Sequence, residues 1–427
     1  MDCLKFVHCA DLHLDSPMEG MRAVSPDIAA VLQEATFRSF QNVIDLAIRE
    51  RVDFLIIAGD VYDSADRSLR AQLRFRDGLV RAAEHGIWTF LVHGNHDPLS
   101  GWEAGLRLPD LVVRYGAAVE AKTYRRGGEE VARLYGVSYP VREVRSNLAR
   151  QFAPEVDRSR RQGTVPFHIG ILHCNVAGNP SHDNYAPCSV GDLAEVGLDL
   201  WALGHVHNRQ LIRPQAPSIL YPGNTQGRSV RETGERGCYL VEVGEEGNIR
   251  YRFIPTQAVR WFQEEAGIEG LDGFDDLWEI LRKKKEEVRS QAAGQPAVLH
   301  LVLGGRGSLH PDPDRREELA DNLVSRLREE EEGRTDFVWV ESLEVRTRPA
   351  IDLERRREVQ DFVGEFLRCA EAMRKDGGAR AIRQALAARS EYRRLRAHVE
   401  RLTDRDLLDI LAEAEALGLD LLATEGE

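Results

Sequence analysis

Five short clusters of histidine, aspartate and asparagine carry the strongest chemical signal in this sequence. Each cluster directly follows a short apolar run of the kind that forms a buried strand. The clusters are Asp11-Leu12-His13, Gly59-Asp60, Gly94-Asn95-His96-Asp97, His173 and Gly204-His205-Val206-His207. Loops at the carboxyl ends of strands in an α/β sheet can bring residues that are distant in sequence onto one point. One such histidine alone is more often structural than a ligand, but five clusters in this arrangement predict one shared site.

The side chains in these clusters suit divalent metal ions. Four histidines, two aspartates and an asparagine provide seven nitrogen or oxygen ligands: Asp11, His13, Asp60, Asn95, His173, His205 and His207. With one aspartate bridging, they fill four protein positions on each of two metals and leave room for water and substrate. Imidazole and carboxylate without thiolate favour Mn, Fe or Zn over Ca or a structural zinc site. Cys9 and Cys174 lie beside the clusters but are expected to face away from the site.

The elements that must position these ligands alternate between strands and helices. Helices are expected over residues 27–50 and 66–85 from the spacing of their apolar residues. Strands are expected over residues 4–9, 54–58, 87–92, 131–137, 167–172, 198–203, 219–221, 239–243 and 249–254. This alternation favours an α/β fold.

Three regions are expected along the 427 residues, a length that suits more than one domain. Residues 1–255 carry the clusters, and residues 256–350 form a small α+β unit with helices over 274–292 and 314–328 and strands over 297–303 and 337–345. Residues 351–427 are helical.

Residues 374–405 in this tail contain ten basic and four acidic residues. Such a stretch is either a solvated helix face or a surface for a partner or a phosphate backbone.

Net charge, cysteine content and the lengths of the apolar runs limit the classes of partner and the cellular compartment that are expected for this protein. Lys and Arg total 57 against 70 for Asp and Glu, a net charge of −13, so DNA could be held only by a local patch and not by bulk charge. Six cysteines without a CxxC pair fit reduced thiols. No apolar run approaches the length that spans a bilayer, and no signal peptide fits at the start. A cytoplasmic chain without a membrane segment is therefore expected.

The order DxH, GD, GNHD, a lone histidine and GHxH resembles the calcineurin-like metallophosphoesterase superfamily. The stretches CADLHLDSP, GDVYD, GNHD, ALGHVH and YPGNTQGR are similar to those of SbcD-type DNA repair exonucleases, particularly the YhaO-like branch. The resemblance covers roughly residues 4–255. It implies an α/β fold with a β-sandwich core flanked by helices, a small α+β capping domain and a helical C-terminal region that offers a docking place for a partner.

The resemblance also implies roles for individual residues. One metal would be held by Asp11, His13, Asp60 and His207, and the second by Asp60, Asn95, His173 and His205, with Mn²⁺ expected at both. His96 matches the catalytic histidine, close to the leaving oxygen. The archaeal and eukaryotic nucleases of this class have a histidine three residues after the bridging aspartate, where this chain has Asp63. Related phosphatases carry an aspartate there that orients the catalytic histidine, which implies the same role for Asp63.

The segment from Tyr221 to Arg228 has two interpretations. It is either a plain turn after a strand or a contact to substrate phosphate, with Asn224 and Arg228 as the binding residues.

The function implied is a manganese-dependent DNA phosphodiesterase in DNA repair, an exonuclease with or without endonuclease activity. It would work by attack of hydroxide, formed between two metals, on the phosphodiester. Its implied partner is an SMC-like coiled-coil ATPase (SbcC-like or YhaN-like), and relatives commonly form homodimers. Two alternatives stay open: a phosphodiesterase or phosphatase for a small nucleotide or other phosphoester, and a non-catalytic scaffold for the ATPase.

Overall fold

The computed structural model describes residues 4–18, 25–63, 68–161, 163, 167–178, 183–244, 247–311, 313–350, 353–375, 378–389 and 402–423. The chain divides into two compact units. The first comprises residues 1–264, 282–301 and 320–343, and the second comprises residues 265–281, 302–319 and 344–427. All the candidate site residues belong to the first unit.

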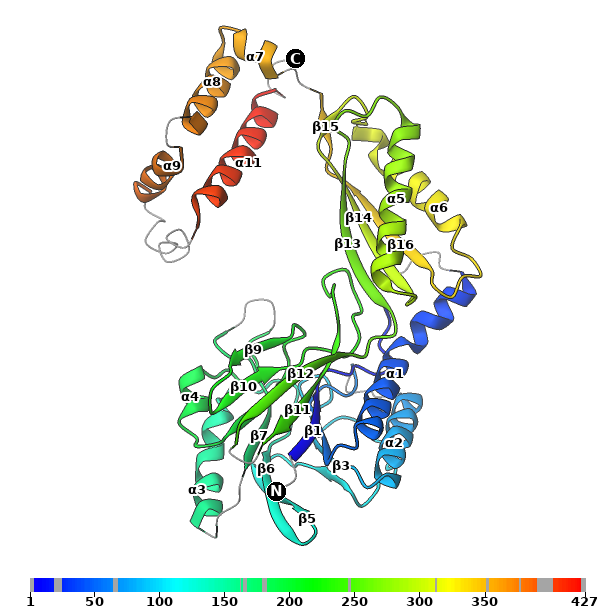
Figure 1. Ribbon diagram of the computed structural model, residues 1–427, viewed down its shortest axis with the longest axis vertical. Helices are drawn as coiled ribbons and strands as arrows, with labels where there is room; N and C mark the ends of the chain where they lie inside the picture. Colours follow the sequence, from blue (N-terminus) through cyan, green and yellow to red (C-terminus); the bar gives the residue numbers. More distant parts are fainter. Residues whose placement is uncertain are drawn as a thin grey trace. The chain divides into compact units, whose positions relative to one another are not determined.

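Two six-stranded sheets form the centre of the first unit (Figure 1). The first sheet has the order β12 (Ile249–Pro255), β11 (Gly237–Val243), β1 (Leu4–Cys9), β2 (Phe54–Ala58), β3 (Trp88–Val92) and β4 (Val112–Arg114). The second has the order β5 (Glu120–Arg126), β6 (Glu129–Gly136), β7 (His168–His173), β8 (Leu200–Gly204), β10 (Ser218–Tyr221) and β9 (Gln210–Arg213). Strands β1 to β4 are parallel, as are β6, β7, β8 and β10, so their carboxyl ends meet at one edge of each sheet.

The two sheets pack face to face around a shared apolar core. Along β2, Phe54 and Ile56 point into this core, which the second sheet completes with residues such as Ile169 and Leu200. The alternate residues Leu55 and Ile57 point to the opposite face. Both faces of such a strand are buried, which explains why its sequence is continuously apolar.

Helices cover both outer faces of this sandwich (Figure 1). Helices α1 (Pro26–Arg49) and α2 (Leu69–Glu84) pack on the first sheet, with Phe40 and Phe75 in contact. The second sheet is covered by η1 (Ala149–Phe152), α3 (Ala153–Arg161) and α4 (Val190–Ala194). The α/β fold with a helix-flanked β-sandwich is therefore confirmed.

A smaller sheet follows in the chain, with the order β13 (Arg260–Gly267), β14 (Ala297–Gly304) and β16 (Val338–Val345). Helices α5 (Phe274–Ala292) and α6 (Arg316–Glu329) lie close to their expected ranges, with the short η2 (Pro313–Arg315) before α6. Strands β15 (Arg306–Gly307) and β17 (Arg348–Pro349) form a two-stranded ribbon. Strand β13 was not expected, because its adjacent Trp261 and Phe262 are both buried and hide the alternation of a strand.

The C-terminal region is helical, as expected: it contains α7 (Leu353–Glu358), α8 (Phe362–Lys375), α9 (Gly378–Ala387) and α11 (Asp404–Ala423). Residues 390–401, which carry much of the basic stretch, lie outside the described residues. Within the described ranges, no helix combines the length and apolarity needed to cross a bilayer.

Candidate metal centre

The five clusters meet where the carboxyl ends of strands from both sheets come together. Hydrogen bonds join the loops across the sheets: the backbone N–H of His205 donates to Asp11 Oδ1 at 3.0 Å, and Nδ1 of His173 donates to the carbonyl of Ala58 at 3.0 Å. Carboxylate and imidazole atoms of Asp11, His13 and His207 approach one another closely, as do those of Asp11, Asp60 and His173. The predicted convergence of these clusters is therefore what the structure shows.

The backbone at several of these positions is held in the left-handed region. The angle φ is +52° at Asp11, +44° at His13, +49° at Asp60 and +103° at His205. Non-glycine residues rarely adopt this conformation, which costs about 1–3 kcal/mol each and clusters at functional sites. Its concentration at four of the seven predicted ligands marks this loop cluster as a site and not as a set of ordinary turns.

Glycines allow the loops to approach so closely. A Cβ atom at Gly94 would lie 2.3 Å from Asp60 Oδ1, and one at Gly59 (φ +97°) would lie 2.3 Å from Nδ1 of His173. Real side-chain atoms do not approach at these distances. The glycines of the GD and GNHD motifs therefore provide the space in which the carboxylate and imidazole groups are gathered.

The ring nitrogens of His13 and His207 converge in a way that fits a cation between them. Nδ1 of His207 lies 2.5 Å from Glu232 Oε1, so this nitrogen carries the proton and donates. Nδ1 of His13 lies 2.9 Å from Asp63 Oδ1, within ion-pairing distance although not aligned as a hydrogen bond. The Nε2 atom of His207 therefore presents a lone pair, and it lies 3.2 Å from Nε2 of His13. A cation between these two nitrogens would take the place of the proton that they otherwise share.

A second set of acceptors converges on His173. Nδ1 of His173 donates to a carbonyl, so Nε2 is the ring nitrogen that faces the site, and the proton on Nε2 is the one that a bound cation would displace. That atom lies 3.0 Å from Asn95 Oδ1 and 3.3 Å from Asp60 Oδ2, both acceptors. The donor set therefore fits a cation here as well. His205 contributes a ring 5.1 Å from that of His173, although its Nε2 is directed to the carbonyl of Asp183 at 2.8 Å.

Burial and neighbouring charges shift the pKa values of several groups in this cluster. Burial raises the pKa of Asp11 to about 6, against the pull of His173 and His207. Burial alone would lower the pKa of His173, but the carboxylates of Asp60 and Asp11 and the carbonyl of Ala58 together outweigh it and raise that pKa to about 9. His13, buried and close to Arg228, has its pKa lowered to about 3. The negative charge of the buried carboxylates therefore favours a positive charge within the cluster. A divalent cation would supply that charge.

His96 lies at the edge of the cluster, with its side chain about one-third exposed. Its backbone N–H donates to Asp60 Oδ1 at 2.9 Å, and its Nδ1 donates to the backbone carbonyl of Asp63 at 2.9 Å. The Asp63 carboxylate is farther away, at 3.7 Å from Nδ1 of His96, and is closer to His13 and to Nη1 of Arg228 (2.8 Å). In this structure the main chain of Asp63 holds His96, while its side chain faces His13 and Arg228.

The two predicted substrate-binding residues differ in accessibility. Asn224 is fully buried; its amide donates to the carbonyl of Gln226, and its Oδ1 accepts from Arg236. This geometry agrees with the interpretation of Asn224 as part of a structural turn. Arg228 is mostly buried and donates from Nη1 to Asp63 and to Ser16 Oγ, each at 2.8 Å.

Sequence reasoning missed two carboxylates that support the cluster. Glu232 contacts His207, but no motif marks it, because the contact spans 25 residues. Asp97 accepts from the backbone N–H groups of Val61 (3.0 Å) and Gly94 (2.8 Å) and contacts His93 Nδ1 at 2.9 Å. It therefore ties the loop after β2 to the loop after β3. Its place in the GNHD motif was the available signal.

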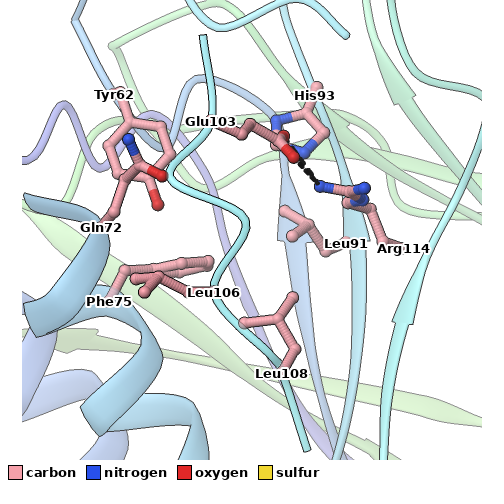
Figure 2. Close-up of a pocket in the computed structure, with 9 residues that line it drawn as sticks. All are labelled: Tyr62, Gln72, Phe75, Leu91, His93, Glu103, Leu106, Leu108 and Arg114. Atoms are coloured by element: carbon pink, nitrogen blue, oxygen red, sulfur yellow. Dashed lines mark hydrogen bonds and ion pairs between the residues drawn. The ribbon is translucent and has the colours of Figure 1, made fainter. Parts of the chain in front are cut away.

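A small pocket lies behind these loops, between α2, β3 and the segment that leads to β4 (Figure 2). Phe75, Leu91 and Leu106 give it an apolar wall, and an ion pair joins Glu103 to Arg114 at 2.8 Å. Its cavity of about 40 Å³ holds a few water molecules and is too small for a nucleotide. The chemistry is therefore assigned to the loop cluster.

Comparison with known proteins agrees with this geometry. Residues 4–209 match the family described as calcineurin-like phosphoesterase, and residues 261–348 match the middle domain of metallophosphoesterase YhaO. The chain is 38% identical over 339 residues to the uncharacterized metallophosphoesterase YhaO of Bacillus subtilis, covering 79% of this chain and 80% of that protein. The chain belongs to the YhaO-like calcineurin-like metallophosphoesterases. As a member of this family, it is a metal-dependent phosphoester hydrolase.

More distant relatives of this YhaO-like metallophosphoesterase are named DNA double-strand break repair protein Mre11. The protein from Aeropyrum pernix is 30% identical over 324 residues, which cover 70% of this chain and 73% of the relative. The protein from Sulfurisphaera tokodaii is 23% identical over 321 residues, which cover 72% and 75%.

Proposed function

We propose that this YhaO-like metallophosphoesterase is a manganese-dependent DNA phosphodiesterase that acts as an exonuclease in DNA repair. The observation that carries the proposal is the convergence of buried imidazole nitrogens and carboxylate oxygens on one point, with His96 at their exposed edge. Relatives named as DNA double-strand break repair proteins support DNA as the substrate.

The assignment of ligands follows the two convergent sets. We propose that Asp11, His13, Asp60 and His207 hold one cation and that Asp60, Asn95, His173 and His205 hold the other. Asp60 is suited to bridge, because its carboxylate lies 3.3 Å from Nε2 of His173 and 4.0 Å from Nε2 of His13. His205 would turn its ring away from the Asp183 carbonyl to contribute Nε2.

When bound, the two cations would activate water and neutralise charge on the substrate phosphate. The residues of the chain then complete the reaction. The Asp63 carbonyl fixes the orientation of His96 through Nδ1, which leaves Nε2 directed outward as the proton carrier for the leaving oxygen. The hydrogen bond from the His96 backbone to Asp60 links the position of this residue to the bridging carboxylate.

A His96→Ala variant tests this function. Release of nucleotides from linear DNA and hydrolysis of bis-p-nitrophenyl phosphate should both depend on Mn²⁺ and fall by about 10²–10⁴-fold in the variant, a typical general-acid contribution. Metal content should stay at the wild-type value, because His96 is outside the proposed ligand sets. Wild-type activity in the variant would remove His96 from its role. Cleavage of the small diester but not of DNA by the wild type would favour a small substrate.

The remaining regions of the chain have proposed roles too. We propose that residues 1–255 form the nuclease domain, that residues 256–350 form a capping domain and that the helices of residues 351–427 dock a cytoplasmic SMC-like coiled-coil ATPase. Exposed apolar side chains on these helices, Phe362 and Leu417, suit such an interface. A Phe362→Ser variant should lose co-elution with the ATPase and keep hydrolysis of the small diester.

A further inference from the structure

Two carboxylates outside the proposed ligand sets face the distal nitrogens of His13 and His207. Glu232 Oε1 accepts from Nδ1 of His207 at 2.5 Å, and Asp63 Oδ1 lies 2.9 Å from Nδ1 of His13. The Nε2 atoms of the two rings converge at 3.2 Å. Glu232 therefore fixes the ring nitrogen that His207 presents to the centre of the site, while Asp63 places a negative charge beside the ring of His13.

Arg228 joins the two carboxylates. Its backbone N–H donates to Glu232 Oε2 at 2.7 Å, and its guanidinium donates from Nη1 to Asp63 Oδ1 at 2.8 Å. The side chains of Arg228 and Glu232 are 14% and 12% exposed, so the contact between these two residues is largely shielded from solvent. Arg228 thus sets the distance between the carboxylates of Glu232 and Asp63.

The half of the site around His173 is held by a neutral backbone carbonyl and not by a carboxylate. The distal nitrogen of His173 donates to the backbone carbonyl of Ala58. A carboxylate partner increases the basicity of an imidazole ligand and fixes its tautomer more strongly than a neutral carbonyl does. Loss of the Glu232 carboxylate should therefore lower the cation affinity of the half-site of His13 and His207 and leave the affinity of the His173 half-site unchanged.

We propose that Glu232 and Arg228 are positioning residues for the cation held by His13 and His207, and that they set the affinity of this half-site separately from that of the other. This inference rests on the proposed metal centre. Neither residue is a ligand; Glu232 acts through His207, and Arg228 acts through Glu232 and Asp63.

The test is Mn²⁺ binding by the full-length, metal-free chain, measured by isothermal titration calorimetry. Wild type should bind two ions, and Glu232→Gln should weaken one of the two binding steps by about 10–100-fold, the usual effect of removing such an outer carboxylate. The weakened step should be the one lost in His207→Ala and not the one lost in Asn95→Ala. Glu235→Gln, an exposed residue of the same loop, is the matched control and should bind both ions as wild type does.

Arg228→Ala gives an independent readout if Glu232→Gln folds poorly. It should weaken the same binding step, with unchanged far-ultraviolet circular dichroism. Wild-type affinity at both steps in the two variants, or equal weakening of both steps, would overturn the inference. A wild-type chain that binds no Mn²⁺ would instead refute the proposed function, so the two failures are distinguishable.

Discussion

Asp11, His13 and Asp60 each hold a backbone conformation that L-residues avoid, and each also brings a charged or polar side chain into the interior. Both features cost free energy of folding, on the order of 1–3 kcal/mol for the backbone of each residue. They persist because hydrogen bonds fix the loops, for example from the backbone of His13 to the carbonyl of Asp60.

Gly94→Ala tests how closely packed the site is. The added Cβ would lie 2.3 Å from Asp60 Oδ1 and 2.8 Å from the His173 ring, so one of these groups must move. A displacement of this kind should lower turnover of bis-p-nitrophenyl phosphate by about 10²-fold. Gly191→Ala is the control, because its nearest neighbour would be 3.5 Å away. Equal activity in the two variants would show that the site tolerates a methyl group there.

His8 makes the fold sensitive to acid. It is fully buried, its Nε2 donates to the carbonyl of Leu203, and burial lowers its pKa from 6.5 to about 3. Between these values the unfolded chain binds a proton that the folded chain does not, so stability falls as the pH falls below 6.5. At pH 5 this amounts to about 2 kcal/mol.

Urea unfolding of the metal-free protein at pH 7 and pH 5 measures this effect. The loss of stability should be about 2 kcal/mol smaller in His8→Gln, which keeps a donor for Leu203 but does not titrate. His85→Gln, at an exposed position, should behave as wild type does. A pH dependence in His8→Gln equal to that of wild type would assign the acid sensitivity to other groups.

At the scale of elements, strands with two buried faces were the most predictable. Strands β1 and β2 have the bounds expected from their apolar runs, and the convergence of the candidate ligands could be predicted because each cluster follows such a run. Strand β5 escaped prediction because it is a polar edge strand, with Arg126 held by Asp53 across the sandwich. The orientation of His205 and the role of Glu232 depend on contacts between distant loops, which strand patterns do not encode.

A buried ion cluster beside the small sheet should dominate the stability of that region. Glu331 is fully buried, lies 2.8 Å from Nζ of Lys285 and from Arg289, and accepts from the backbone of Val338 at 2.7 Å. Glu331→Gln leaves the buried Lys285 without this charge and should cost about 3–5 kcal/mol. Thermal unfolding measures this loss of stability. Glu332→Gln, at an exposed position, is the control and should change the unfolding temperature little. Similar unfolding temperatures for both variants would contradict this role of Glu331.

At the scale of the whole molecule, all proposed ligands belong to the first of the two compact units. Binding of Mn²⁺ should therefore stabilise that unit, by about 2.7 kcal/mol for one site at a free concentration 100 times its dissociation constant. Scanning calorimetry with EDTA and then with excess Mn²⁺ should show the transition of the first unit shifting upward. A shift in the transition of the second unit alone would contradict this assignment.

The ligand loops come from both sheets of the sandwich: Asp11 and Asp60 follow strands of the first, and His173 and His205 end or follow strands of the second. A cation bound by this proposed set of ligands would connect the two sheets. A slip of one sheet by a single residue, about 3.3 Å, would separate the ligands by more than any metal bond allows. If these residues hold the ion as proposed, only a chain whose two sheets have docked in register would retain it, and the bound ion would resist shear between the two sheets.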